Sequence, residues 1–403
     1  MHRRQFLADA GRLLGGALAT GLLGRRANAA TGSEADAMKL ALCGDVMTGR
    51  GVDQILEHPS DPRIHEPWVR NARRYVELAE EVNGPIPRPA EPTYIWGEAL
   101  TELALFDPDL RLINLETAIT GSDDFWPGKG IHYRMHPANV SCLTAAAVDC
   151  CVLANNHVID WGYAGLHETL DTLKRVRIAA VGAGETRLAA EEPAIFEASP
   201  GRRVLVFAVG TGSSGIPADW AATGQRAGVS RLDSLSPAAV SSLAGQISRY
   251  RRAGDVVLLS IHWGTNWGYE VSAEQRRFAH ALIDEAGVDV VHGHSSHHPR
   301  GIEVHRRKPI LYGCGDFLND YEGIGGHEEY RPDLTLLYEL DLEGRTSELG
   351  RLRLIPFRLR RFQLRRTSPH DTEWLQRRLD EVCRKLGTRV LRSREHLEVT
   401  AAA

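Results

Sequence analysis

Residues 38–46 read MKLALCGDV, an apolar run that ends in Gly44-Asp45. A short apolar run of this kind is typical of a buried strand. The same pattern, an apolar run followed by an acid, an amide or an imidazole, returns at residues 110–116, 148–154, 255–261 and 288–294. Helical patterns at 163–176, 236–252 and 273–286 separate several of these runs. The alternation of buried strands and helices predicts a layered α/β protein.

The polar residues that follow these strands are of the kinds that bind metals or transfer protons. They are Asp45, Glu116, Asn156, His157, His262 and His294. Ligand sites of layered α/β proteins collect at the carboxyl ends of strands. One such residue is usually a cap or a satisfied core group, but a series along one chain predicts a shared site.

Carboxylate, amide and imidazole groups together suit a divalent transition metal. Hard cations prefer oxygen ligands, whereas zinc, manganese and iron also accept imidazole. The run 292–298 adds more histidines, and the expected ligands are Asp45, Glu116, Asn156, His262, His294 and His297. A cation held there would activate a bound water and polarise a phosphoryl or carbonyl oxygen. His157 would then protonate a leaving group.

Several motifs carry a resemblance to a known family. They include GDVMTGR at 44–50, NLE at 114–116, LANNHVIDWGYAGLHETLDTL at 153–173, HWG at 262–264 and GHSSHHPRGIEV at 293–304. Across roughly residues 38–320 the chain resembles the CapA family of poly-γ-glutamate capsule biosynthesis proteins, a branch of the calcineurin-like metallophosphoesterases. The resemblance implies an α/β/β/α sandwich of two mixed sheets flanked by helices, with metals at the strand ends.

The resemblance also implies individual roles. Asp45 would bind one metal, and Glu116 would bridge two. Asn156 would bind the second metal, and His157 would be the catalytic acid. The remaining implied ligands are His262, His294 and His297.

Three positions depart from the superfamily pattern. Met47 stands where phosphoesterases usually have a histidine ligand, and a thioether binds hard cations poorly. Glu116 is longer than the usual bridging aspartate, and Asp316 stands where CapA relatives usually have asparagine. Either one or two metal ions are compatible with this set. Asp160 and Asp316 are expected to lie next to the metal ligands and His157 and to orient them without binding the metal.

The loop at 121–137 carries the expected substrate contacts. Lys129, His132 and Arg134 are candidates for binding an anionic substrate, because Lys and Arg bind carboxylate and phosphate well. Ordinary solvated loop charges are the alternative. The expected substrate is an anionic polymer similar to poly-γ-glutamate, or a phosphoester. The rival hypothesis is a non-catalytic component that binds the polymer during export.

Residues 1–29 have the features of a twin-arginine signal peptide. Arg3-Arg4 precede a weakly apolar run at 13–24, and Ala27-Asn28-Ala29 provide a cleavage site. Export to the periplasm or cell surface is expected, where membrane-associated capsule machinery would be a partner. An uncleaved membrane anchor is the alternative.

Composition and cysteine spacing exclude other classes. The formal net charge of −4 provides no broad field for nucleic acid. Six cysteines without a C-x-x-C pair are expected to be core residues, not disulfides or zinc ligands. One domain is expected over 38–366, followed by a C-terminal helix and tail over 367–403.

Overall fold

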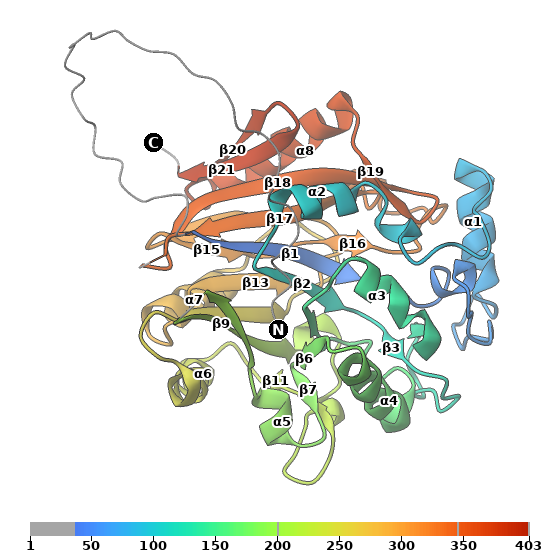
Figure 1. The fold of residues 1–403 in the computed structure, drawn as a ribbon, viewed down its shortest axis with the longest axis horizontal. Helices are drawn as coiled ribbons and strands as arrows, with labels where there is room; N and C mark the ends of the chain where they lie inside the picture. The colour runs from blue at the N-terminus through green and yellow to red at the C-terminus, as the bar shows by residue number, and fades with distance from the viewer. Residues whose placement is uncertain (1–36, 200, 345, 402–403) are drawn as a thin grey trace, which may run out of the picture.

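The computed structural model describes residues 37–199, 201–344 and 346–401. The protein is a mixed α/β sandwich in which two large sheets face each other and helices cover their outer faces (Figure 1). This is the fold class expected from the sequence. The segment predicted to be a signal peptide, 1–29, lies outside the described residues.

The first sheet contains both parallel and antiparallel pairs. Its strands follow the order β20 (Thr388–Ser393), β21 (His396–Ala401), β18 (Leu349–Arg360), β17 (Leu334–Leu342), β1 (Met38–Val46), β2 (Leu110–Leu115), β5 (Cys150–Val152) and β6 (Ala179–Val181). In addition, β16 (Asp316–Leu318) pairs with β1, and β19 (Gln363–Arg366) pairs with β18. Strands β1, β2, β5 and β6 run parallel to one another, so their carboxyl ends lie at the same edge of the sheet.

The second sheet is also mixed. Its order is β11 (Arg231–Leu232), β9 (Arg202–Thr211), β12 (Val256–His262), β13 (Val290–His294), β15 (Lys308–Leu311) and β14 (Ile302–His305), with β8 (Ala194–Ser199) antiparallel to β9. In the parallel pair β12–β13, the last residues are aligned, so that His262 faces His294. Two short pairs complete the strands: β3 (Ala118–Ile119) with β4 (Arg134–Met135), and β7 (Ala183–Gly184) with β10 (Gly228–Val229).

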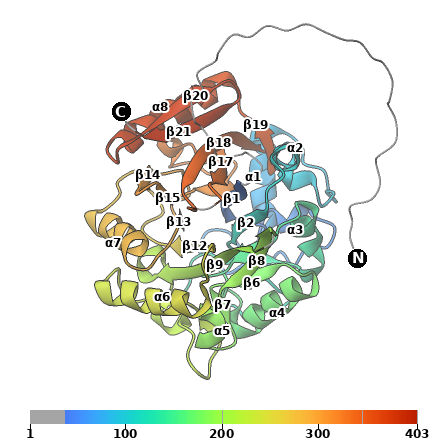
Figure 2. The same cartoon turned by 60° about the vertical axis from the view of Figure 1, so that its left-hand side comes forward.

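The helices lie on the outside of the sandwich. The first sheet is covered by α1 (Arg73–Asn83), α2 (Ala99–Phe106), α3 (Ser141–Ala145) and α4 (Gly162–Arg175). Figure 2 shows α6 (Pro237–Tyr250) and α7 (Ala273–Asp284) outside the second sheet, and their apolar residues pack against it. The remaining helices are α5 (Arg187–Glu191) and α8 (Pro369–Arg384), and short 3-10 turns occur at Asp53–Ile55, Tyr94–Trp96, Pro137–Val140, Gly212–Ser214, Ala218–Trp220 and Glu328–Tyr330.

The alternation of side chains along β1 explains why residues 40–43 are all apolar. Leu40 and Leu42 point into the core between the two sheets, whereas Ala41 and Cys43 pack under the helices of the first sheet. Successive side chains of a strand point to opposite faces, so a strand covered on both faces needs apolar residues at every position. The polar residue that ends the run, Asp45, lies at the edge of the sheet.

The stretch 308–317 differs from the single strand that its sequence pattern suggests. It forms β15 in the second sheet and β16 in the first, and Gly313–Gly315 carry the chain between the sheets. Gly315 has φ +73°, and a Cβ there would lie 2.7 Å from the His298 backbone, so only glycine fits. This crossing places Asp316 opposite Asp45 in the β1–β16 pair.

The C-terminal segment belongs to the same sandwich. The expectation of a helix and tail over 367–403 omits a hairpin, because β20 and β21 follow α8 and β21 pairs with β18. Leu375 and Leu379 of α8 share the core between the sheets with Leu352. Residues 68–82, whose charges surround the apolar stripe Val69, Tyr75 and Leu78 that is typical of a helix, are helical only from Arg73.

All six cysteines are buried and free, as expected of core residues. Within the described ranges, every helix is too short or too polar to span a lipid bilayer.

Candidate metal centre

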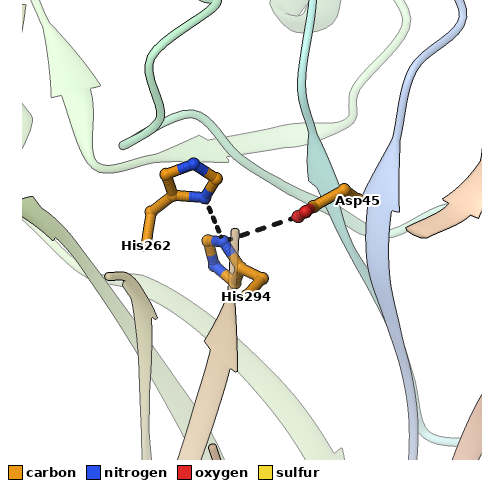
Figure 3. Close-up of side chains that lie close together, drawn as sticks. All are labelled: Asp45, His262 and His294. Atoms are coloured by element: carbon orange, nitrogen blue, oxygen red, sulfur yellow. Dashed lines mark hydrogen bonds and ion pairs between the residues drawn. The ribbon is translucent and has the colours of Figure 1, made fainter. Parts of the chain in front are cut away.

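The carboxyl ends of strands from both sheets meet at one buried site. Asp45 comes from β1, Glu116 follows β2, and Asn156 follows β5. From the second sheet, His262 ends β12 and His294 ends β13 (Figure 3). The structure therefore brings together the strand-end residues that the sequence singled out.

Two groups of side chains within the described residues have the spacing of metal ligands. One consists of Asp45, His262 and His294, and the other of Asp45, His297 and Asp316; within each, the ligand atoms lie within 4.8 Å of one another. Asp45 is common to both groups. In the first group, the Nδ1 atoms of His262 and His294 are 2.6 Å apart, and Nδ1 of His294 is 3.7 Å from Oδ1 of Asp45. In the second, Nδ1 of His297 is 2.8 Å from Oδ1 of Asp316.

A chain of hydrogen bonds determines which nitrogen of His294 carries the proton. The Cys43 carbonyl can only accept, so Nε2 of His292, at 2.9 Å, is the donor. Burial lowers the pKa of His292 to about 4, so its Nδ1 is an acceptor, and the Ser260 hydroxyl donates a hydrogen bond to it at 3.0 Å. The Ser260 oxygen in turn accepts from Nε2 of His294 at 2.8 Å. The lone pair of His294 Nδ1 is thereby directed at His262 and Asp45.

The contact between His262 and His294 suits a bound cation. Nε2 of His262 lies 2.8 Å from the Asn156 side-chain oxygen and donates to it, which leaves His262 Nδ1 as a second lone pair. Two lone pairs at 2.6 Å repel unless a proton or a cation lies with them. Burial lowers the pKa of both imidazoles well below the ordinary value, so placing a proton between them costs more free energy than placing a metal cation there.

The carboxylate oxygens at the site outnumber the hydrogen-bond donors that face them among the described residues. Burial and the nearby Asp316 raise the pKa of Asp45 to about 7. Burial and Asp45 raise the pKa of Glu116 well above its usual value. Oε2 of Glu116 is buried without a hydrogen-bond partner among the described residues. Buried, crowded acceptors of this kind are stabilised by a cation, so the residues fit one or two divalent ions.

His157 lies beside this cluster and is oriented by a carboxylate. Its Nδ1 is 2.6 Å from Oδ2 of Asp160, and its Nε2 is 3.7 Å from Oε1 of Glu116. Burial lowers the pKa of His157 to about 4, although the Asp160 carboxylate opposes this shift. The Tyr133 ring packs edge-on against the imidazole, and the centroids of the two rings are 4.7 Å apart. His157 is thus neutral at neutral pH, with Nε2 toward the cluster.

The three predicted substrate contacts all have protein partners in the structure. Lys129 forms an ion pair with Asp160 and donates to the Asn156 carbonyl. Nε2 of His132 lies 2.9 Å from the Trp126 carbonyl. Arg134 lies 3.8 Å over the Trp161 ring and its guanidinium donates to Ser122 O, Asp123 Oδ1 and Asp61 O. These contacts hold the loop around His157, although Nδ1 of His132 is buried without a hydrogen-bond partner among the described residues.

The two predicted supporting acids have different positions. Asp160 contacts His157 directly and also accepts from the Tyr133 backbone N–H at 2.7 Å. Asp316 lies within the candidate ligand cluster itself, because β16 runs alongside β1. Met47, at the usual histidine position, is buried and its sulfur accepts from the Tyr321 hydroxyl at 3.7 Å. The second candidate group therefore contains Asp316 and His297, and Met47 belongs to neither group.

Sequence reasoning missed the residues that hold Asp45 and His294. Nδ2 of Asn114 donates to Asp45 Oδ1 at 2.7 Å, and Asn155 donates to Asn114 at 3.0 Å. Ser260 and His292 orient His294 as described above. The signal was available for His292, since it lies two residues before His294 and a strand places such residues on the same face.

Comparison with known proteins identifies the family. A family model described as bacterial capsule synthesis protein PGA_cap matches residues 39–321. A probable polyglutamine synthesis accessory protein of Mycobacterium tuberculosis is 48% identical over 370 residues, which cover 91% of this chain and 97% of that protein. The PGA biosynthesis protein CapA of Bacillus subtilis is 26% identical over 322 residues, which cover 80% of this chain and 71% of that protein. The chain belongs to the family of bacterial capsule synthesis proteins described by PGA_cap.

Proposed function

We propose that this protein is an exported, metal-dependent hydrolase that acts on an anionic polymer during capsule or polyglutamate synthesis. The names of its relatives, a polyglutamine synthesis accessory protein and a PGA biosynthesis protein, support a role in the synthesis of a polymer of glutamine or glutamate residues, and the second name supports an anionic one. The observation that carries the proposal is the position of His157, whose Nε2 lies 3.7 Å from Glu116 at the edge of the candidate metal centre. A phosphoester is the second substrate class.

The cation would be held by residues from both sheets. The first group would bind through Asp45, His262 and His294, and the second through Asp45, His297 and Asp316. Glu116 has a free buried oxygen, and Asn156 lies beside His262, so both are placed to contribute. When bound, a divalent cation lowers the pKa of water and polarises a phosphoryl or carbonyl oxygen.

His157 would move the proton. Asp160 accepts from Nδ1 and fixes the ring, so a proton is gained and released at Nε2. Burial lowers the pKa of His157 to about 4, so the resting ring is neutral, and it would take a proton at Nε2 from the attacking water and give it to the leaving group. Lys129 neutralises Asp160 on its other oxygen and keeps this carboxylate in place.

Export is part of the same proposal. The Arg3-Arg4 pair and the apolar run after it support transport by the twin-arginine route, which carries folded proteins and so suits a metal enzyme. Membrane-associated capsule machinery would then be the partner at the cell surface.

A second function is a non-catalytic component that binds the polymer during export. It is favoured by Met47, which removes one ligand of the usual two-metal centre. The deciding experiment incubates metal-loaded wild type and His157→Ala with poly-γ-glutamate and with a generic phosphodiester. The enzyme proposal expects product from at least one substrate with the wild type only. Polymer binding without any product from either substrate would support the second function.

A further inference from the structure

Arg300 is a buried cation that forms no ion pair within the described part of the chain. It follows β13 in the histidine-rich motif and is 5% exposed. Its backbone N–H donates to the Gly313 carbonyl at 2.8 Å. Its stem lies against Gly313, where any Cβ would be 2.8 Å from Arg300 Cδ. The stem is therefore fixed, and Nε of Arg300 has no hydrogen-bond partner among the described residues.

Other buried cations of the protein are paired with carboxylates. Arg50 forms ion pairs with Glu66, at 3.0 Å, and with Asp320. Lys129 is paired with Asp160. Burial lowers the pKa of Arg300 to about 10, although the exposed Glu270 opposes this shift from beyond ion-pair distance. Burying a guanidinium without a charged partner costs free energy, so an anionic ligand from outside the chain would stabilise Arg300.

A second unused donor points to the same place. Gln275 is 6% exposed, and its Nε2 has no hydrogen-bond partner among the described residues. Its Oε1 accepts from the Ser272 N–H at 3.3 Å in the capping box of α7, which fixes the amide. A Cβ on Gly264 would lie 3.0 Å from Gln275 Nε2 and 3.4 Å from Arg300 Nη1. Both donors thus converge beside Gly264, which has φ +84° and is partly exposed.

This point is connected to the candidate metal centre by short contacts. Gly264 follows His262 by two residues, and its carbonyl accepts from the Ser295 hydroxyl at 3.4 Å. The Ser295 N–H donates to Oδ2 of Asp45 at 3.2 Å. A group bound at Gly264 would therefore lie next to the residues proposed to act on the substrate.

We propose that Arg300 and Gln275 form an oxyanion subsite beside Gly264, and that it binds a carboxylate of the polymer. The proposal rests on the proposed function and adds to it the chemical group of the polymer that the site recognises. A guanidinium and an amide N–H₂ present only donors, which match the acceptor oxygens of a carboxylate. A carboxamide in its place has one oxygen, no charge and an N–H₂ that would face these donors. The subsite should therefore select a carboxylate polymer over its carboxamide analogue.

The test measures binding of a γ-linked glutamate oligomer by calorimetry to the full, metal-loaded protein. Arg300→Gln removes the charge, and we expect the affinity to fall about tenfold or more. Gln275→Glu keeps the capping-box acceptor but gives Arg300 a carboxylate from within the chain, so a similar loss is expected with an unchanged or higher Tm. Arg277→Gln, on the exposed side of the same helix, removes the same charge and should bind like the wild type. The matching γ-linked oligomer with its α-carboxylates converted to carboxamides should bind the wild type at least about tenfold more weakly.

The outcomes separate this proposal from the function on which it rests. Equal affinity in wild type, Arg300→Gln and Gln275→Glu overturns the subsite, even if metal content and hydrolysis are intact. Inorganic phosphate and a phosphodiester are the second set of probes. If only these bind, and bind more weakly to Arg300→Gln, the oxyanion subsite stands but its ligand is phosphate, and the polymer substrate is wrong. If the wild type binds neither kind of anion, the subsite is overturned. Should Arg300→Gln fail to fold, Gln275→Glu alone decides.

Discussion

Nδ1 of His157 lies 2.6 Å from Oδ2 of Asp160, and Lys129 binds the other oxygen of the same carboxylate. All three side chains are held close together at the edge of the candidate metal centre, although Lys129 comes from a loop that precedes His157 by 28 residues. Asp160 therefore orients the imidazole of His157. Because Lys129 is already paired with Asp160, its ammonium group is not free to bind a substrate.

Replacing Asp160 with Asn tests this orienting role. The variant keeps the shape of the side chain but loses the acceptor charge that fixes the Nδ1 proton. We expect kcat to fall about 10- to 100-fold, the usual effect of removing such a partner. Metal content should stay at the wild-type level, because Asp160 contacts His157 and not the candidate ligands. An unchanged kcat, or a loss of metal equal to that of a ligand variant, would contradict the assignment.

Replacing His157 with Ala tests the proton transfer itself. We expect turnover to fall by about two to four orders of magnitude, with metal content nearly intact. The loss should be smaller for substrates with good leaving groups, since these need little protonation. Rates for a series of phenyl phosphodiesters of decreasing leaving-group pKa measure this dependence. Should His157→Ala lose its metal as fully as Asp45→Asn, His157 is a ligand and not an acid.

Asp380 provides a pH test of the fold that is independent of the metal centre. Burial alone would raise its pKa, but hydrogen bonds from Arg389, the Val390 N–H and Arg384 lower it to about 2. The folded state thus favours the charged form, so this contribution to stability is present above about pH 4 and is lost as pH falls through 2. Asp380→Asn should reduce the free energy of unfolding at pH 6 by about 1–3 kcal/mol.

Denaturant unfolding of wild type and Asp380→Asn between pH 6 and pH 2 gives the comparison. The two proteins should differ most at pH 6 and become similar near pH 2. A difference that stays constant over this range would show that the carboxylate charge does not link α8 to β20.

Changing Arg3 and Arg4 together to Lys tests export. If the twin-arginine signal is used, the precursor should accumulate in the cytoplasm, while a wild-type copy reaches the periplasm or cell surface. Cell fractionation and immunoblotting measure the distribution. Matched substitution of Arg25 and Arg26 by Lys, beyond the apolar run, serves as the control and should leave export unchanged. Normal export of the Arg3/Arg4 variant would exclude this route.

Much of the site could be predicted because its residues follow local patterns. Asp45, Glu116, His262 and His294 each end an apolar run, and parallel strands bring such ends to one edge. The fold class followed from the same runs. The alternation of buried strands and helices required covered sheets, and the apolar residues of β1 are indeed shared between two cores.

The rest depends on tertiary contacts that local patterns do not contain. Asp316 enters the ligand cluster only because glycines carry the chain from one sheet to the other. The sequence does not show that Lys129 is paired, because its partner, Asp160, is 31 residues away. The opposite holds for Arg300, whose lack of a carboxylate partner is visible only when the described neighbours are in place. The final hairpin was missed because β20 and β21 are short, with six residues each, and neither contains a long apolar run.

The most direct test of the account is elemental analysis of protein purified without chelators, compared among wild type, Asp45→Asn and Asp316→Asn. Asp45 belongs to both ligand groups and Asp316 to only one. We therefore predict at least one equivalent of a transition metal in the wild type, almost none in Asp45→Asn, and an intermediate or unchanged content in Asp316→Asn. A wild type that stays free of metal after incubation with manganese, zinc and iron, or an Asp45→Asn variant that binds as much metal as the wild type, would contradict the metal centre and the function built on it.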